Sequence, residues 1–142
     1  MQNIIIITPP NITLKYFVEK LEPYYDVDMV SDDRIVITDE ERYIAINLDE
    51  YVAEEYEEKE LNLISQVIKH PQFFIIEFSH FDLLKQIIPF CVNPPVFLID
   101  NDHGDIFSGR EFLLKLNKDP RWDWRRGYGI RGGTPVWCSN KF

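Results

Sequence analysis

The sequence contains few cysteines and no long hydrophobic run. Its two cysteines, Cys91 and Cys138, lie far apart, without the CxxC spacing of a metal site or the density of a disulfide framework. The longest apolar runs, such as Ile4–Ile7, are much shorter than the roughly 20 residues that a membrane helix requires. No basic residue precedes Lys15, so we expect no signal peptide. These absences predict a protein of the reducing cytoplasm that has no membrane segment.

Length and composition limit the organisation of the chain. With 142 residues it has the size of one domain, and 45% of the residues are hydrophobic and 14% aromatic. A chain of this length buries enough surface to fold without a disulfide or a structural metal. We therefore expect a single domain over residues 1–142, with no cofactor and no metal.

The negative charge is concentrated in the first part of the chain. The net charge is −9, but residues 1–60 hold sixteen acidic and five basic residues, whereas residues 61–142 hold eight acidic and ten basic residues. A strongly acidic surface repels nucleic acids and membrane surfaces and attracts basic partners over long range. A basic protein partner is therefore favoured over nucleic acid or a membrane, and the plainer alternative is that the acids only keep the protein soluble.

Apolar periodicity and turn residues divide the chain into alternating strands and helices. The pattern predicts strands near residues 4–7, 25–30, 35–38, 43–48, 73–78, 96–99 and 105–107, and helices near 14–21, 49–69, 82–91 and 108–116. The three strands between residues 25 and 48 are separated by short polar turns, as in an antiparallel meander. We expect an α/β or α+β fold, with one mixed sheet that includes this meander and with helices packed on it.

The stretch from Asp49 to about Lys69 is predicted to be one long helix. Asp49 is a suitable N-cap, and Val52 and Tyr56 belong to the apolar stripe that faces the core. Six glutamates occur between residues 50 and 60. This is more than a helix N-terminus needs, and like charges four positions apart are mildly destabilising. The first turns of this helix therefore predict an outward-facing acidic surface.

The chain changes character after Asp119. Trp122 and Trp124 flank Asp123, and four of the six glycines follow. We expect an irregular Gly/Trp-rich tail over residues 120–142. Two indoles two positions apart cannot share one helix face. We interpret them as locking the last helix onto the sheet, with a binding role as the alternative.

The strongest catalytic candidate is the run Asp100-Asn101-Asp102-His103-Gly104-Asp105 after a hydrophobic strand. Paired carboxylates in this position resemble the Mg²⁺-binding nucleophile motif of haloacid-dehalogenase-type phosphotransferases. That motif opens its domain, whereas here only about forty residues follow, and His103 replaces a small residue. We therefore favour a polar hairpin turn and a protein that is not an enzyme. The alternative function is a small metal-dependent hydrolase or phosphotransferase that uses Asp100 and Asp102.

Residues 96–125, VFLIDNDHGDIFSGREFLLKLNKDPRWDWR, resemble a segment of small bacterial immunity proteins. These belong to polymorphic-toxin systems, including contact-dependent growth inhibition. The resemblance implies a cytoplasmic antidote that binds and blocks one cognate toxin, often a nuclease. Independently, an acidic inhibitor can imitate the polyanion that a cationic nuclease site holds.

Together, the charge pattern and the resemblance predict where a basic toxin domain would bind. The expected contact residues on the acidic helix are Glu50, Tyr51, Glu54, Glu57 and Glu58. Tyrosine is enriched in protein interfaces, and the surrounding carboxylates supply a complementary field. The competing hypothesis places the contact at the acidic turns of the meander, which contain Asp32, Asp33, Asp39 and Glu40.

Overall fold

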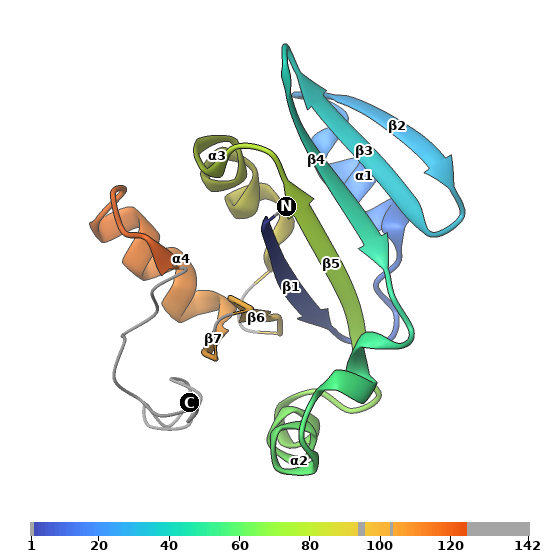
Figure 1. Cartoon of the computed structure of the whole chain (residues 1–142), viewed down its shortest axis with the longest axis vertical. Coiled ribbons are helices and arrows are strands. Elements are labelled where there is room, and N and C mark those ends of the chain that lie inside the picture. Colours follow the sequence, from blue (N-terminus) through green and yellow to red (C-terminus); the bar gives the residue numbers. More distant parts are fainter. Residues whose placement is uncertain (1, 94–95, 103, 125–142) are drawn as a thin grey trace.

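The computed structural model describes residues 2–93, 96–102 and 104–124 (Figure 1). In chain order the elements are β1 (Gln2–Thr8), α1 (Leu14–Leu21), β2 (Asp26–Ser31), β3 (Arg34–Asp39), β4 (Arg42–Leu48), the 3₁₀-helix η1 (Val52–Glu55), α2 (Glu58–Val67), β5 (Gln72–Phe78), α3 (Phe81–Cys91), β6 (Leu98–Asp100), β7 (Ile106–Ser108) and α4 (Gly109–Lys118). Except between residues 49 and 69, each element lies close to the position that periodicity predicts.

All seven strands belong to one sheet, in the order β2-β3-β4-β5-β1-β6-β7. Each neighbouring pair is antiparallel, from the meander β2-β3-β4 to the hairpin β6-β7. The expected single-domain α+β fold is confirmed. The sheet is antiparallel throughout its described strands rather than mixed, because β1 lies between β5 and β6 and runs opposite to both.

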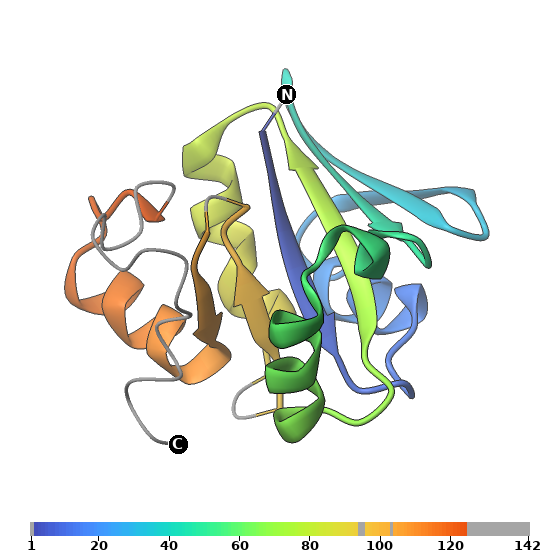
Figure 2. The ribbon, with the colours of Figure 1, turned by 60° about the horizontal axis from the view of Figure 1, so that its bottom comes forward.

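Helices cover both faces of the sheet. In Figure 2, η1 and α2 lie in front of the sheet, and α1 and α3 lie behind it. Strand β1 contributes to both sides, since Ile4 and Ile6 enter one buried cluster while Ile5 and Ile7 enter the other. A strand covered on both faces needs a continuous apolar run rather than an alternating one. This explains the four consecutive isoleucines near the start of the chain.

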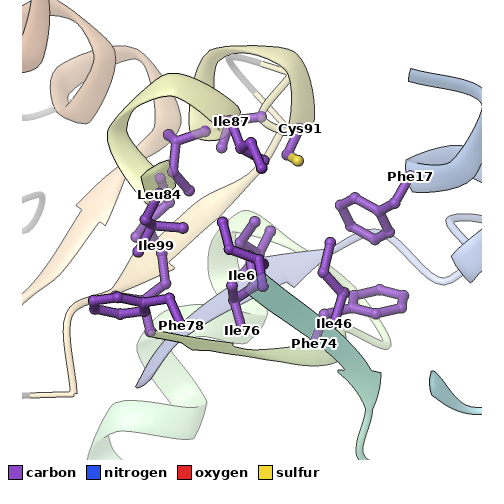
Figure 3. Packing of buried hydrophobic residues seen from close by; sticks show 14 of the residues in the cluster. Ile6, Phe17, Ile46, Phe74, Ile76, Phe78, Leu84, Ile87, Cys91 and Ile99 are labelled. Carbon is purple, nitrogen blue, oxygen red and sulfur yellow. The ribbon is translucent and has the colours of Figure 1, made fainter. Parts of the chain in front are cut away.

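The larger core lies between the sheet and the helices α1, α3 and α4. Figure 3 shows Ile6, Ile46, Phe74 and Ile76 from the sheet facing side chains of the covering helices. Phe17 of α1 packs edge-on against Phe74, with 4.8 Å between ring centroids. Side chains from six strands and three helices thus share one continuous core.

Cys91 is a free, fully buried thiol, and burial raises its pKa to about 12. A thiol in such surroundings is inert. Cys138 lies outside the described residues. No helix within residues 2–93, 96–102 and 104–124 is both long and apolar enough to cross a membrane.

The prediction of one long helix from Asp49 to Lys69 is wrong. The chain forms η1, becomes extended at Tyr56 and Glu57, and restarts as α2. Asp49 does cap the first turn, since its Oδ1 accepts the backbone N–H groups of Tyr51 (2.7 Å) and Val52 (3.1 Å). A second cap, formed by Glu57 and Glu60, starts α2. Repulsion between glutamates four positions apart disfavours one uninterrupted helix.

The two tryptophans after α4 differ in burial. Trp124 is completely buried in the larger core, with its ring 4.3 Å from Phe81 and 5.0 Å from Phe112. Trp122 is half-buried and packs edge-on against Phe107 at 5.5 Å. The interpretation that these indoles lock the last helix onto the body of the protein agrees with this packing. The rest of the expected tail, residues 125–142, lies outside the described residues.

Candidate protein-binding surface

The predicted contact residues between positions 50 and 58 lie on the η1–α2 segment, which packs on one face of the sheet. Glu50, Glu54, Glu57 and Glu58 are exposed. Tyr51 is the most exposed large hydrophobic side chain of the described part, at 71%. Val52 anchors the segment because its side chain is buried against Ile5 and Ile7 of β1. The carboxylates are thus presented by a backbone that the core holds in place.

The structure brings Asp32 and Asp33 to the same end of the sheet. These residues form the turn between β2 and β3, and the Asp33 carbonyl accepts the backbone N–H of Leu48 at 2.9 Å. Leu48 is the last residue of β4, directly before the acidic segment. We define the acidic patch as Asp32, Asp33, Glu50, Tyr51, Glu54, Glu57 and Glu58. Antiparallel pairing of β3 with β4 places the Asp32-Asp33 turn beside the start of the acidic segment.

No carboxylate of the acidic patch forms an ion pair within the described residues. The ion pairs there use other acids, namely Glu19, Asp39, Glu77 and Asp82. Exposed like charges repel one another and lower the stability of the folded chain. Six carboxylates without an ion pair among the described residues therefore form a surface that a cationic partner would stabilise.

Asp39 and Glu40 lie apart from the acidic patch. They stand at the opposite end of β3, which spans about 17–20 Å for its six residues. Asp39 is neutralised by Arg42, with 2.5 Å between Oδ2 and Nη2, and Arg42 also contacts Asp82 at 3.1 Å. Glu40 has a φ of 58° in the tight turn to β4. The predicted acidic turns are therefore two separate sites, and only the Asp32-Asp33 turn joins the patch.

Asp100 and Tyr56 form a partly buried polar contact between the η1–α2 segment and the sheet. The Tyr56 hydroxyl donates to Asp100 Oδ2 at 2.5 Å, and the Asp102 backbone N–H donates to Asp100 Oδ1 at 2.8 Å. Burial raises the pKa of Asp100 to about 6, although both hydrogen bonds act in the opposite direction. Burial and the neighbouring Asp100 charge raise the pKa of Tyr56 above its ordinary value.

The segment after Asp100 is a hairpin turn between β6 and β7. Asn101 holds it together, because its Oδ1 accepts the Asp105 N–H (3.1 Å) and its Nδ2 donates to the Trp124 carbonyl (2.7 Å). Asp102, with a φ of 61°, is exposed. The turn is thus shaped by Asn101, Asp102 and Asp105, as expected for a polar hairpin turn.

A small acidic pocket of about 180 Å³ lies between this turn and the η1–α2 segment. Its polar lining consists of Glu55, Tyr56, Glu60, Asp100 and Asp102. No group of three or more His, Cys, Asp or Glu side chains in the described part is placed to hold a metal ion. His103, which belongs to the catalytic alternative, lies outside the described residues.

Sequence reasoning placed Tyr56 in the apolar stripe and missed its bond to Asp100. The ring does pack on the core, 5.5 Å from Phe73 in a stacked arrangement. The hydroxyl, however, contacts a carboxylate 44 positions later in the chain. No spacing rule connects these two residues. The available signal was the tyrosine itself, since a buried phenol usually requires a hydrogen-bond partner.

Comparisons of the chain with protein-family models, with curated proteins and with solved structures find no match.

Proposed function

We propose that the protein is an immunity-type inhibitor that binds a basic toxin domain through the acidic patch and catalyses no reaction. The proposal includes a cytoplasmic location, in keeping with the scarcity of cysteine. It rests chiefly on one observation, the six exposed carboxylates of the acidic patch that form no ion pair within the described residues.

Electrostatics explain how such a surface would neutralise a nuclease. A nuclease site that holds phosphates is cationic, so a group of carboxylates can occupy it in place of the substrate. The same charges steer the two proteins together, with association rates that fall as ionic strength rises. Inhibition then requires only that the acidic patch cover the site.

Tyr51 is the proposed apolar anchor within these charges. Its side chain is 71% exposed, while the backbone around it is fixed by Asp49 and by the burial of Val52. Aromatic side chains that are rigidly presented often dominate interface energies. A basic partner with a shallow apolar depression beside its active site would fit both Tyr51 and the flanking glutamates.

Co-purification tests the proposal directly. The full chain is co-expressed with the carboxy-terminal domain encoded by a neighbouring toxin gene, and the domain is assayed for nuclease activity alone and in the complex. The proposal expects a stable complex at low salt, loss of nuclease activity, and weaker binding as salt is added. Catalytic turnover by the chain itself, with no effect on such a domain, would overturn it.

The alternative of a small hydrolase retains one supporting observation. Asp100 combines a raised pKa with a position beside a pocket, which is typical of acid-base residues. Against this, both Asp100 oxygens already accept hydrogen bonds from the chain. We therefore favour the inhibitor.

A further inference from the structure

Strand β2 forms one end of the sheet and exposes an unpaired backbone edge. One side of β2 pairs with β3, and no strand in the described part pairs with the other side. Asp26 and every residue from Asp28 to Ser31 are exposed. An edge strand of this kind presents free N–H and C=O groups to another extended chain. In Figure 1 the strand lies at the outer margin of the sheet.

The two faces of β2 differ in chemistry. Asp26 and Asp28 lie opposite Thr38 and Val36 of β3, whereas Val27 and Met29 lie opposite Ile37 and Ile35, which belong to the larger core. Val27 packs partly on that core, and Met29 is left 57% exposed beside it. The edge therefore carries two carboxylates on one face and an uncovered apolar side chain on the other.

These charges discriminate between possible occupants. Pairing of β2 with β2 of a second copy would bring Asp26 and Asp28 close to the same carboxylates, and like charges across a strand pair are destabilising. A strand with lysine or arginine at alternate positions would instead face them with opposite charge. Apolar residues between the basic ones would cover Met29. The edge thus disfavours a second copy in this register and fits a basic, alternating strand.

The edge also continues into the acidic patch. Strand β2 ends at Ser31, directly before Asp32 and Asp33 of the patch. The regular pairing with β3 runs from Asp26 to Met29 and is followed by a bulge between Met29 and Ser31. Because a bulge interrupts an edge, the stretch available for pairing is about four residues long, or roughly 13 Å.

We propose that the open edge of β2 receives an extended segment of the basic partner as an additional strand, with basic side chains facing Asp26 and Asp28 and an apolar side chain covering Met29. This inference rests on the proposed function only for the basic character of the partner. It adds backbone pairing, which fixes the orientation of the complex, to the charge attraction of the acidic patch.

A synthetic peptide tests the inference without the natural partner. The probe is a capped heptapeptide of alternating valine and lysine, added to the ¹⁵N-labelled full chain. We expect slower hydrogen exchange for amides between Asp26 and Val30. The same peptide with N-methylated central residues keeps all charges but lacks the N–H donors, and it should not give this protection. No peptide binding, equal binding of the methylated peptide, or protection confined to other strands would each overturn the inference.

Charge variants separate pairing at the edge from unspecific attraction. Asp26→Asn with Asp28→Asn should weaken peptide binding about threefold for each carboxylate removed. The matched control, Glu19→Gln with Glu41→Gln, removes two exposed carboxylates outside the edge and the acidic patch, so it changes the net charge equally and should leave binding within twofold. An equal loss in both double variants would mean unspecific attraction and would overturn the inference.

The two proposals can fail separately. If the toxin domain binds while the β2 amides exchange as in the free chain, strand addition is wrong and the inhibitor proposal stands. If the peptide pairs with β2 but no basic toxin domain is bound, the proposed function is wrong and the edge remains a strand-binding site.

Discussion

The Tyr56 hydroxyl donates a hydrogen bond to Asp100 Oδ2 at 2.5 Å and thereby connects the η1–α2 segment to the end of β6. The two residues stand on different elements that pack together through Ile5, Val52 and Ile106. The packing of these elements is apolar, and this hydrogen bond adds a directional contact beside the small acidic pocket. A buried carboxylate in this position makes stability depend on pH.

Asp100 should make the folded chain less stable as the pH rises. Its pKa is about 6 in the folded chain against 3.8 ordinarily, so the folded chain keeps a proton that the unfolded chain releases. Its contribution to stability is complete below about pH 4 and is lost as the pH passes 6, a difference of about 3 kcal/mol. Urea unfolding measures the free energy of unfolding of the protein and of the Asp100→Asn variant at pH 4 and pH 7.5. Relative to the unchanged protein, the variant should be more stable at pH 7.5 than at pH 4. If the difference in free energy of unfolding is the same at both pH values, Asp100 does not titrate in this range.

The turn between β3 and β4 offers a stabilising substitution. Glu40 has a φ of 58°, a left-handed conformation that costs a side-chain-bearing residue about 1–2 kcal/mol. Glu40→Gly should therefore leave stability unchanged or raise it by about 1 kcal/mol, while Glu40→Val should lower it. Thermal unfolding measures both. The control Glu41→Gly, at a position without positive φ, should not stabilise, and a gain there equal to that at position 40 would contradict the explanation.

Charge reversal in the acidic patch should abolish tight binding without unfolding the chain. Glu54→Lys with Glu58→Lys should reduce the affinity for a basic toxin domain by orders of magnitude, mainly by slowing association at low salt. Glu57 is left unchanged because it caps α2. Binding kinetics at several salt concentrations check the result, with Glu22→Lys and Glu41→Lys as the control of equal charge. Tight, salt-independent binding by the patch variant would remove this surface as the contact.

Trp124 should be among the most stabilising side chains. Its ring is fully buried against Phe81 and Phe112, so Trp124→Ala should cost about 3–5 kcal/mol. Trp124→Phe should cost less than the alanine variant, because it keeps an aromatic ring in the core and the indole Nε1 has no hydrogen-bond partner among the described residues to lose. Denaturant unfolding compares the two. An alanine variant of unchanged stability would assign this residue to a partner surface.

The turn after β6 should bind no divalent metal. If Asp102 only shapes the hairpin, calorimetry with Mg²⁺, Mn²⁺ or Ca²⁺ should show no binding in the micromolar range, and Asp102→Asn should leave any inhibitory activity intact. Stoichiometric uptake that Asp102→Asn abolishes would revive the metal-dependent hydrolase. The left-handed φ of Asp102 makes Asp102→Gly the companion variant, which should fold at least as stably.

Local sequence was sufficient for most of the secondary structure. The run Ile4–Ile7, the polar turns of the meander and the N-cap Ser108, whose Oγ accepts the Glu111 N–H at 3.1 Å, each act within a few residues. Such signals depend on backbone conformation and on contacts between residues close in the sequence, so the order of the residues is enough to predict them. The exposure of the glutamates between positions 50 and 58 was predictable for the same reason, since uncompensated charges are not buried.

Tertiary structure decided what these local signals leave open. The backbone becomes extended at Tyr56, where the side chain stacks on Phe73 and donates a hydrogen bond to Asp100. Local sequence signals alone favoured a continuous helix from Asp49, because they do not include these long-range contacts. Strand pairing set Asp33 beside Leu48 and placed Asp39 at the far end of β3. The sequence by itself thus determined which residues carry charge at the surface. The pairing of distant strands decided which of these residues lie near one another, because that pairing depends on contacts between residues far apart in the chain.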